Sequence, residues 1–108
     1  MEGKIYTIGG KELEMFTLGV LAKCLDRDSQ TIRKWELNGI IPQATYRSAS
    51  NHRLYTRRQI EAIVQCVKKH NIRAGLPITQ AFKDDVKEAF ERATQADFEE
   101  DYVSSEEG

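Results

Sequence analysis

The hydrophobic positions of this chain follow a period of two near its start and a helical period afterwards. Residues 4–8, KIYTI, and 11–16, KELEMF, are strand-like runs, and Gly9-Gly10 separates them. A Gly-Gly pair suits a two-residue hairpin turn, because glycine reaches positive φ without steric cost. Residues 1–16 are therefore predicted to form an N-terminal β-hairpin extension.

Two short helices with a polar break between them are predicted next. Leucines at helical spacing follow Thr17, which can cap a first helix ending near Leu25. In "DRD" the apolar pattern stops, and Asp28 can accept hydrogen bonds from the first backbone N–H groups of a second helix over 29–38. Gly39 then supplies the residue that ends this helix.

A second hairpin is predicted over 43–56, "QATYRSASNHRLYT", with the polar "SASN" at its tip. Thr56 and Gln59 have the spacing of a capping box, and the apolar stripe of "QIEAIVQCV" predicts a longer helix after them. These elements place one compact unit over 17–73.

The end of the chain is predicted to contain one more helix and a tail. Within 74–98, Thr79 can cap a helix over 80–98 whose apolar stripe folds back on the core. Residues 99–108 are acidic and nearly lack apolar side chains, so we expect a disordered tail there. Such a tail either competes with a polyanion for basic residues or only aids solubility.

Charge is distributed unevenly along the chain. Residues 23–73 carry eleven Lys and Arg against four Asp and Glu, a net charge of +7, whereas residues 74–108 carry three against ten, a net charge of −7. A basic middle with an acidic end indicates either a polyanionic partner for the middle or two solvated faces that balance each other.

The order of elements adds a reason to expect DNA. Two short helices, a hairpin and a longer helix form the order of a winged helix-turn-helix, in which the second helix enters the major groove near its N-terminus. Ile32 and Trp35 have the spacing to face the core. The candidate groups for DNA in the exposed turns are Ser29, Gln30, Arg33 and Lys34.

Three segments resemble the winged helix-turn-helix domain of MerR-like regulators: "FTLGVLAKCL", "SQTIRKWELNGIIP" and "HRLYTRRQIEAIV". The resemblance covers about Phe16 to Val67 and is closest to the minimal versions found in excisionases and small phage-type proteins. It implies that helix 29–38 enters the major groove and that wing 43–56 grips phosphates. By resemblance, Thr31, Arg33 and Lys34 lie at the groove, and Arg47, Arg53, Tyr55 and Arg57 lie near phosphates.

Arg58 joins these candidates for a physical reason. With Arg57 it begins a helix, where positive charge is unfavourable for the helix dipole, so a phosphate role becomes more plausible. The resemblance stops short of the C-terminal part, where a long dimerisation helix and an effector region are usual in the family. The wing also has "NHR" where the family commonly has "GYR".

The predicted fold class is mainly α with small β-hairpins, a winged helix-turn-helix with an N-terminal hairpin and an extra C-terminal helix. The predicted function is sequence-specific binding of duplex DNA, as a transcription regulator or accessory DNA-binding factor. The alternative is a protein-interaction or assembly module, such as a phage or plasmid adaptor or a recombination or packaging factor. In that role helix 80–98 binds a protein partner or a second copy of the chain.

Composition limits the other classes of function. The chain of 108 residues has no apolar run long enough to span a membrane and no secretory signal, so a cytoplasmic protein is expected. Cys24 and Cys66 are far apart and lack metal-ligand spacing, as do His52 and His70, so no metal site and no cofactor are expected. No nucleophile-and-base pattern or phosphate-binding loop occurs, so no catalytic residues are expected.

Overall fold

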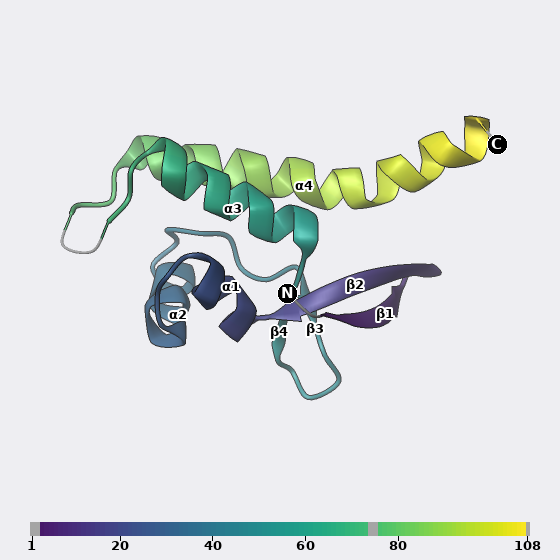
Figure 1. The fold of residues 1–108 in the computed structure, drawn as a ribbon, viewed down its shortest axis with the longest axis horizontal. Coiled ribbons are helices and arrows are strands. Elements are labelled where there is room, and N and C mark those ends of the chain that lie inside the picture. The colour runs from purple at the N-terminus through teal and green to yellow at the C-terminus, as the bar shows by residue number, and fades with distance from the viewer. Residues whose placement is uncertain (1–2, 74–75, 108) are drawn as a thin grey trace.

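The computed structural model describes residues 3–73 and 76–107, with side chains described up to residue 98. Four helices and four strands occur in this part of the chain (Figure 1). Their order is β1 (Lys4–Ile8), β2 (Lys11–Thr17), α1 (Leu18–Cys24), α2 (Ser29–Leu37), β3 (Tyr46–Arg47), β4 (Arg53–Thr56), α3 (Arg57–Lys69) and α4 (Gln80–Glu107).

The strands form a single antiparallel sheet in the order β1-β2-β4-β3. Its central pairing joins β2 to β4, and Phe16 lies opposite Tyr55. The predicted fold class is therefore wrong: the strands are not separate small hairpins of a mainly helical domain, but one curled four-stranded sheet that accompanies the helices. Alternation and turn residues had located both hairpins, but they contain no signal for the pairing of β2 with β4.

The sheet is apolar on both faces because neighbouring side chains on a strand point in opposite directions. Phe16 and Tyr55 belong to the main core, which they share with all four helices. Met15 and Leu54, the strand neighbours of these two aromatic residues, belong with Leu13 to a second, smaller cluster. A strand that is apolar on both faces must be covered on both, which explains why the two hairpins close into one sheet.

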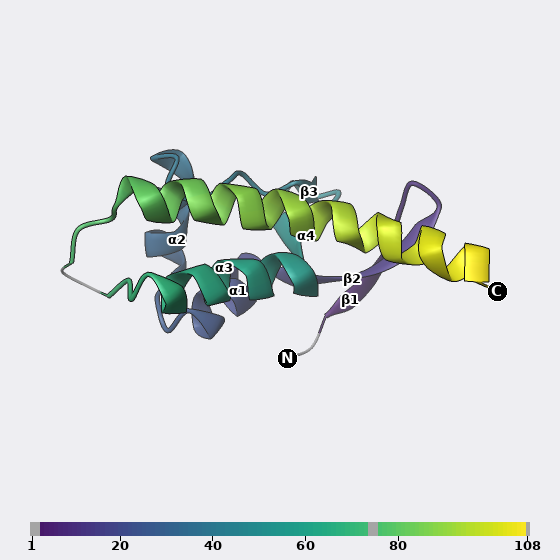
Figure 2. The ribbon, with the colours of Figure 1, turned by 90° about the horizontal axis from the view of Figure 1, so that it is seen from above.

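Helices α3 and α4 lie side by side in opposite directions over the rest of the molecule (Figures 1 and 2). The capping box at Thr56 and Gln59 is confirmed, and the Oγ1 of Thr79 accepts a hydrogen bond from the Phe82 N–H at 3.1 Å. The apolar stripe of α4 is buried in the main core. Helix α4 extends to Glu107, beyond its predicted end at residue 98.

A buried glutamine joins the sheet to this helical pair. The Gln59 side chain, which is 0% exposed, accepts from the Thr56 N–H at 2.9 Å and donates to the Oγ1 atoms of Thr45 at 3.3 Å and Thr94 at 2.8 Å. Its carbonyl and both hydrogens of its amide can therefore be satisfied within the protein, as a buried amide requires. The contacts fix α4 and the chain before β3 to the start of α3.

Phe82 is the residue through which α4 supports the rest of the core. It is 0% exposed, and its ring makes edge contacts with Trp35 and His70 at centroid distances of 6.2 and 5.7 Å. Phe82→Ala should lower the free energy of unfolding by about 3–5 kcal/mol, because it leaves a cavity in a close-packed core. Urea denaturation followed by circular dichroism measures this loss.

Phe98→Ala is the matched control, since it removes the same atoms from a side chain on α4 that is 38% exposed. It should cost a small fraction of the Phe82 value. Equal losses for the two variants would contradict the burial of the Phe82 ring between α4 and α2.

Candidate nucleic-acid interface

Helix α2 is held at both ends by the residues that the sequence predicted. The Asp28 carboxylate accepts a hydrogen bond from the Thr31 N–H at 2.8 Å, and this bond lowers the pKa of the Asp28 carboxyl. At the other end Gly39 has a φ of +71°, the left-handed geometry that ends a helix. Ile32 and Trp35 are buried, as predicted, and they fix which face of α2 points outward.

The outward face of α2 carries polar and basic groups at helical spacing. Gln30, Arg33, Lys34 and Leu37 are exposed and follow an i, i+3, i+4, i+7 pattern, so they lie along one side of the helix. Ser29 and Thr31 are half-buried and flank this stripe. Leu37 is 84% exposed at its C-terminal end. The structure therefore brings together all five predicted groups of α2 near one exposed surface.

Glu36, the only acidic residue of α2, does not share this surface. It is 8% exposed and forms an ion pair with Arg53, whose Nη2 lies 2.8 Å from the Glu36 Oε1. The Arg53 Nε donates to the same oxygen at 2.9 Å, and the Ala44 N–H donates to Oε2 at 3.0 Å. The outward face of α2 therefore carries positive but no negative side chains.

These contacts also determine the charge state of Glu36. Burial raises the pKa of its carboxyl, but the hydrogen bonds from Arg53 and Ala44 outweigh burial, so the pKa is lowered overall. Sequence analysis missed this residue. Its spacing from Ile32 and Trp35, i+4 and i+1, does place it on the buried face, and that was the available signal.

Arg47 is exposed near the tip of the β3–β4 hairpin. Its Nη1 donates to the Asn51 carbonyl at 3.2 Å, and Asn51 has a φ of +65° in the turn. The tip projects from the same side of the molecule as α1 and α2, away from the α3–α4 pair (Figure 1). Two separate basic features, the α2 stripe and the hairpin tip, thus share one side.

Arg53 and Tyr55, both predicted to lie near phosphates, are placed differently. The Arg53 guanidinium is occupied by Glu36 and only 25% exposed. Tyr55 is 0% exposed, and burial raises the pKa of its hydroxyl to about 12. Tyr55 is therefore a core residue at the β2–β4 pairing and is not part of the candidate DNA-binding surface.

Arg57 and Arg58 are exposed but point to other elements. The Arg57 guanidinium lies 3.3 Å from a carboxylate oxygen of Glu14 and above the ring of Phe16. Arg58 lies 3.6 Å from a carboxylate oxygen of Asp97 on α4. Both arginines thus tie the start of α3 to neighbouring elements, and the structure does not group them with the α2 stripe.

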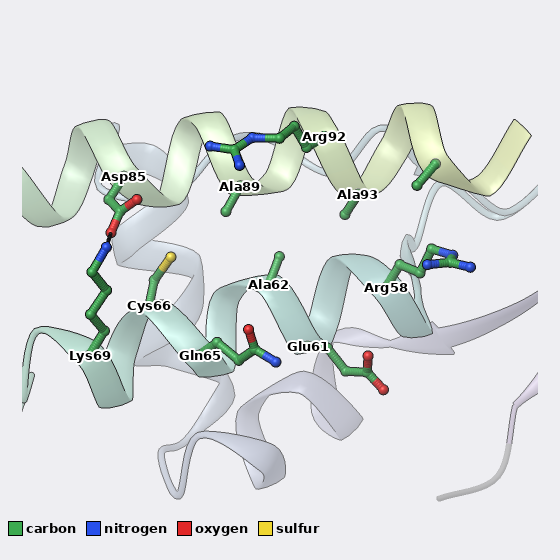
Figure 3. Close-up of a pocket in the computed structure, with 11 residues that line it drawn as sticks. Arg58, Glu61, Ala62, Gln65, Cys66, Lys69, Asp85, Ala89, Arg92 and Ala93 are labelled. Atoms are coloured by element: carbon green, nitrogen blue, oxygen red, sulfur yellow. Dashed lines mark ion pairs between the residues drawn. The ribbon is translucent and has the colours of Figure 1, made fainter. Parts of the chain in front are cut away.

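A groove between α3 and α4 has a volume of about 480 Å³ (Figure 3). Alanines from both helices line it, and an ion pair of 3.0 Å between Lys69 and Asp85 closes one end. Burial raises the pKa of the Cys66 thiol beside it, which disfavours the thiolate. No cluster that could hold a metal occurs among the described side chains.

The alternative role of helix 80–98 as a partner surface loses its main support. That role needs a free apolar stripe, but Phe82, Val86 and Phe90 are buried in the main core. In the described part of α4, Phe98 is the large apolar side chain that remains exposed, at 38%.

Comparisons of the chain with family models, with curated proteins and with solved structures find no match. Within the described residues, none of the helices has the length and apolar content needed to cross a membrane. The surface geometry of α2 and of the β3–β4 hairpin and the sequence resemblance are therefore the features that bear on function.

The lowered pKa of Glu36 predicts a specific dependence of stability on pH. A carboxyl whose pKa is lower in the folded protein stabilises the fold above its ordinary pKa, about 4.5, and this contribution is lost as pH falls through the folded value. The melting temperature of the wild type minus that of Glu36→Gln should therefore shrink when pH falls below about 4.5. Thermal unfolding followed by circular dichroism measures the difference.

Asp97 gives a control of opposite sign. Burial raises the pKa of its carboxyl, so the folded protein binds this proton more readily than the unfolded chain does. The melting temperature of the wild type minus that of Asp97→Asn should consequently grow as pH falls. A Glu36 difference that also grew on acidification would contradict the stabilising role of its charged form.

Proposed function

We propose that this protein binds duplex DNA, with the outward face of α2 in the major groove and the β3–β4 hairpin tip on the adjacent backbone. The observation that carries the proposal is the charge of the α2 face. Gln30, Arg33 and Lys34 are exposed along one side, and the only carboxylate of the helix is buried against Arg53. A polyanion approaching α2 therefore meets donors and positive charge along the stripe, and the exposed Asp28 carboxylate, which interacts with Lys34, lies at its N-terminal end.

The dimensions and donors of this face suit a DNA groove. An α-helix with its side chains is about 10–12 Å across, and the major groove of B-DNA is about 12 Å wide. Arginine and lysine can donate to guanine, glutamine can pair with adenine, and an apolar group such as Leu37 can contact a thymine methyl. The major groove of A-form RNA is too narrow for such an approach, which favours DNA.

The biological class follows from the resemblance to MerR-like regulators. The segments "SQTIRKWELNGIIP" and "HRLYTRRQIEAIV" support a role as a transcription regulator or as an accessory DNA-binding factor. A cytoplasmic location is part of this proposal. The resemblance is limited to these segments. It does not extend to the predicted fold class, which the four-stranded sheet contradicts.

Competition between the acidic C-terminal end and DNA gains no support from the arrangement of the chain. Helix α4 carries this end to the side of the molecule opposite α2 (Figures 1 and 2). The molecule extends 48 Å along its longest axis, whereas the Debye length at physiological salt is about 8 Å. Screening of the α2 face by this end would therefore be weak.

A titration of duplex DNA at several salt concentrations tests the proposal. If Lys34 and Arg47 each neutralise one phosphate while Arg33 contacts a base, log K should fall with log salt at a slope of about −2. Arg47→Ala should reduce this slope by about 1 and weaken all duplexes alike. Arg33→Ala should cost about 1–3 kcal/mol more on a duplex selected from random sequences than on an unselected one.

Arg92→Ala serves as the control for both variants, because it removes the same charge from an α4 side chain that is 68% exposed. Its affinity and salt slope should match those of the wild type. The proposal fails if the wild type shows no salt-dependent association with duplex DNA, or if Arg92→Ala weakens binding as much as Arg33→Ala does.

A further inference from the structure

We propose that Glu36 is a positioning residue that locks the β3–β4 hairpin to the last turn of α2 and so sets the spacing at which α2 and Arg47 engage one duplex. This inference rests on the proposed function and assigns Glu36 and Arg53 a role inside the protein. It also reassigns Arg53, which sequence reasoning had placed on a phosphate.

The geometry shows how one carboxylate joins three segments. Glu36 belongs to α2, Ala44 to the connector after it, and Arg53 to β4. Oε1 of Glu36 receives the Arg53 Nε and Nη2 at 2.9 and 2.8 Å, while Oε2 receives the Ala44 N–H at 3.0 Å. Both oxygens are thus engaged, and each oxygen holds a different segment, β4 or the connector, relative to the α2 axis.

The pairing of β4 with β2 anchors the base of the hairpin in the sheet, and Glu36 adds a direct link from β4 to α2. β3 has two residues and pairs with β4 through Tyr46–Leu54 and Arg47–Arg53. Arg53 therefore contacts Glu36 and also lies directly opposite Arg47, the exposed cation of the tip, on the paired strand. A change in the Arg53 position moves Arg47 directly.

The ion pair between Glu36 and Arg53 has a defined geometry, because its carboxylate is buried and hydrogen-bonded. The Glu36 side chain is 6% exposed, and hydrogen bonds between a charged donor and a charged acceptor are the strongest and most geometrically defined in proteins. Removing one partner of a buried pair leaves the other without compensation, so without the Glu36 carboxylate Arg53 turns toward solvent and β4 loses its direct link to α2. Two binding features joined rigidly at the right spacing act as one bivalent surface, and a loose joint loses most of that advantage.

The test compares the effect of Arg47→Ala in different backgrounds, with a random-sequence duplex as the probe at about 0.1 M salt. In the wild type this substitution should weaken binding about five- to tenfold, the loss of one phosphate contact. In Glu36→Gln it should change binding by less than about twofold, because the tip no longer reaches the backbone while α2 is bound. We call the fold-change in affinity caused by Arg47→Ala the Arg47 factor. If Glu36 only stabilised the fold and did not position the hairpin, the Arg47 factor would be the same in Glu36→Gln as in the wild type.

Glu88→Gln provides the matched background, since it removes the same charge from an α4 side chain that is 67% exposed. There the Arg47 factor should equal that of the wild type. Tighter binding by Glu36→Gln than by Glu88→Gln would mean that the released Arg53 contacts phosphate, and this result would overturn the proposal. An unchanged Arg47 factor in Glu36→Gln would overturn it as well.

Folding and function are separated by two further measurements. If circular dichroism shows that Glu36→Gln is unfolded, Arg53→Gln breaks the same pair from the other side and undergoes the same comparison, with Arg92→Gln as its background control. Failure of the wild type to bind any duplex overturns the proposed function itself. Binding with an equal Arg47 factor in every folded background overturns the role of Glu36 alone.

Discussion

The pairing of β2 with β4 is the interaction on which the rest of the structure depends. It places Met15 opposite Thr56 and Thr17 opposite Leu54. Thr17 and Thr56 each end a strand and cap the helix that follows, α1 and α3 respectively. A single strand pairing therefore fixes the starting points of two helices, and a shift of its register by one residue would turn every side chain of the shifted strand to the opposite face of the sheet.

The local features of the fold could be predicted from the sequence because their signals lie within a few residues. The Asp28 cap, the positive φ of Gly39 and the capping box of Thr56 with Gln59 are all contacts of this kind, and each is confirmed. The end of helix α4 was less predictable, since the helix extends past residue 98 into a segment that nearly lacks apolar residues. A helix already nucleated upstream propagates at little cost, and its backbone needs no core for that.

Features that join distant segments had no such signal. β2 and β4 are separated by two helices, and their pairing decided the fold class. The same limit applied to the candidate site, where a count of arginines treated every guanidinium as equal. Arg53 faces a buried carboxylate, whereas Arg57 pairs with Glu14 at 49% and 40% side-chain exposure, where such a pair contributes little and exchanges readily with water.

Helix α4 changes its meaning once these long-range contacts are known. Its sequence pattern is that of an amphipathic helix that could bind another protein. In the structure, however, its Phe82 ring packs against Trp35 on the inner face of α2. Glu36 anchors the last turn of the same helix from the hairpin side, and Asp28 fixes its first. The contacts of Trp35 with α4 and of Glu36 with β4 come from different elements and leave α2 few ways to tilt. A helix held in this manner retains the alignment of its outward side chains without relying on a ligand to order them, and pre-organisation of this kind reduces the entropic cost of binding.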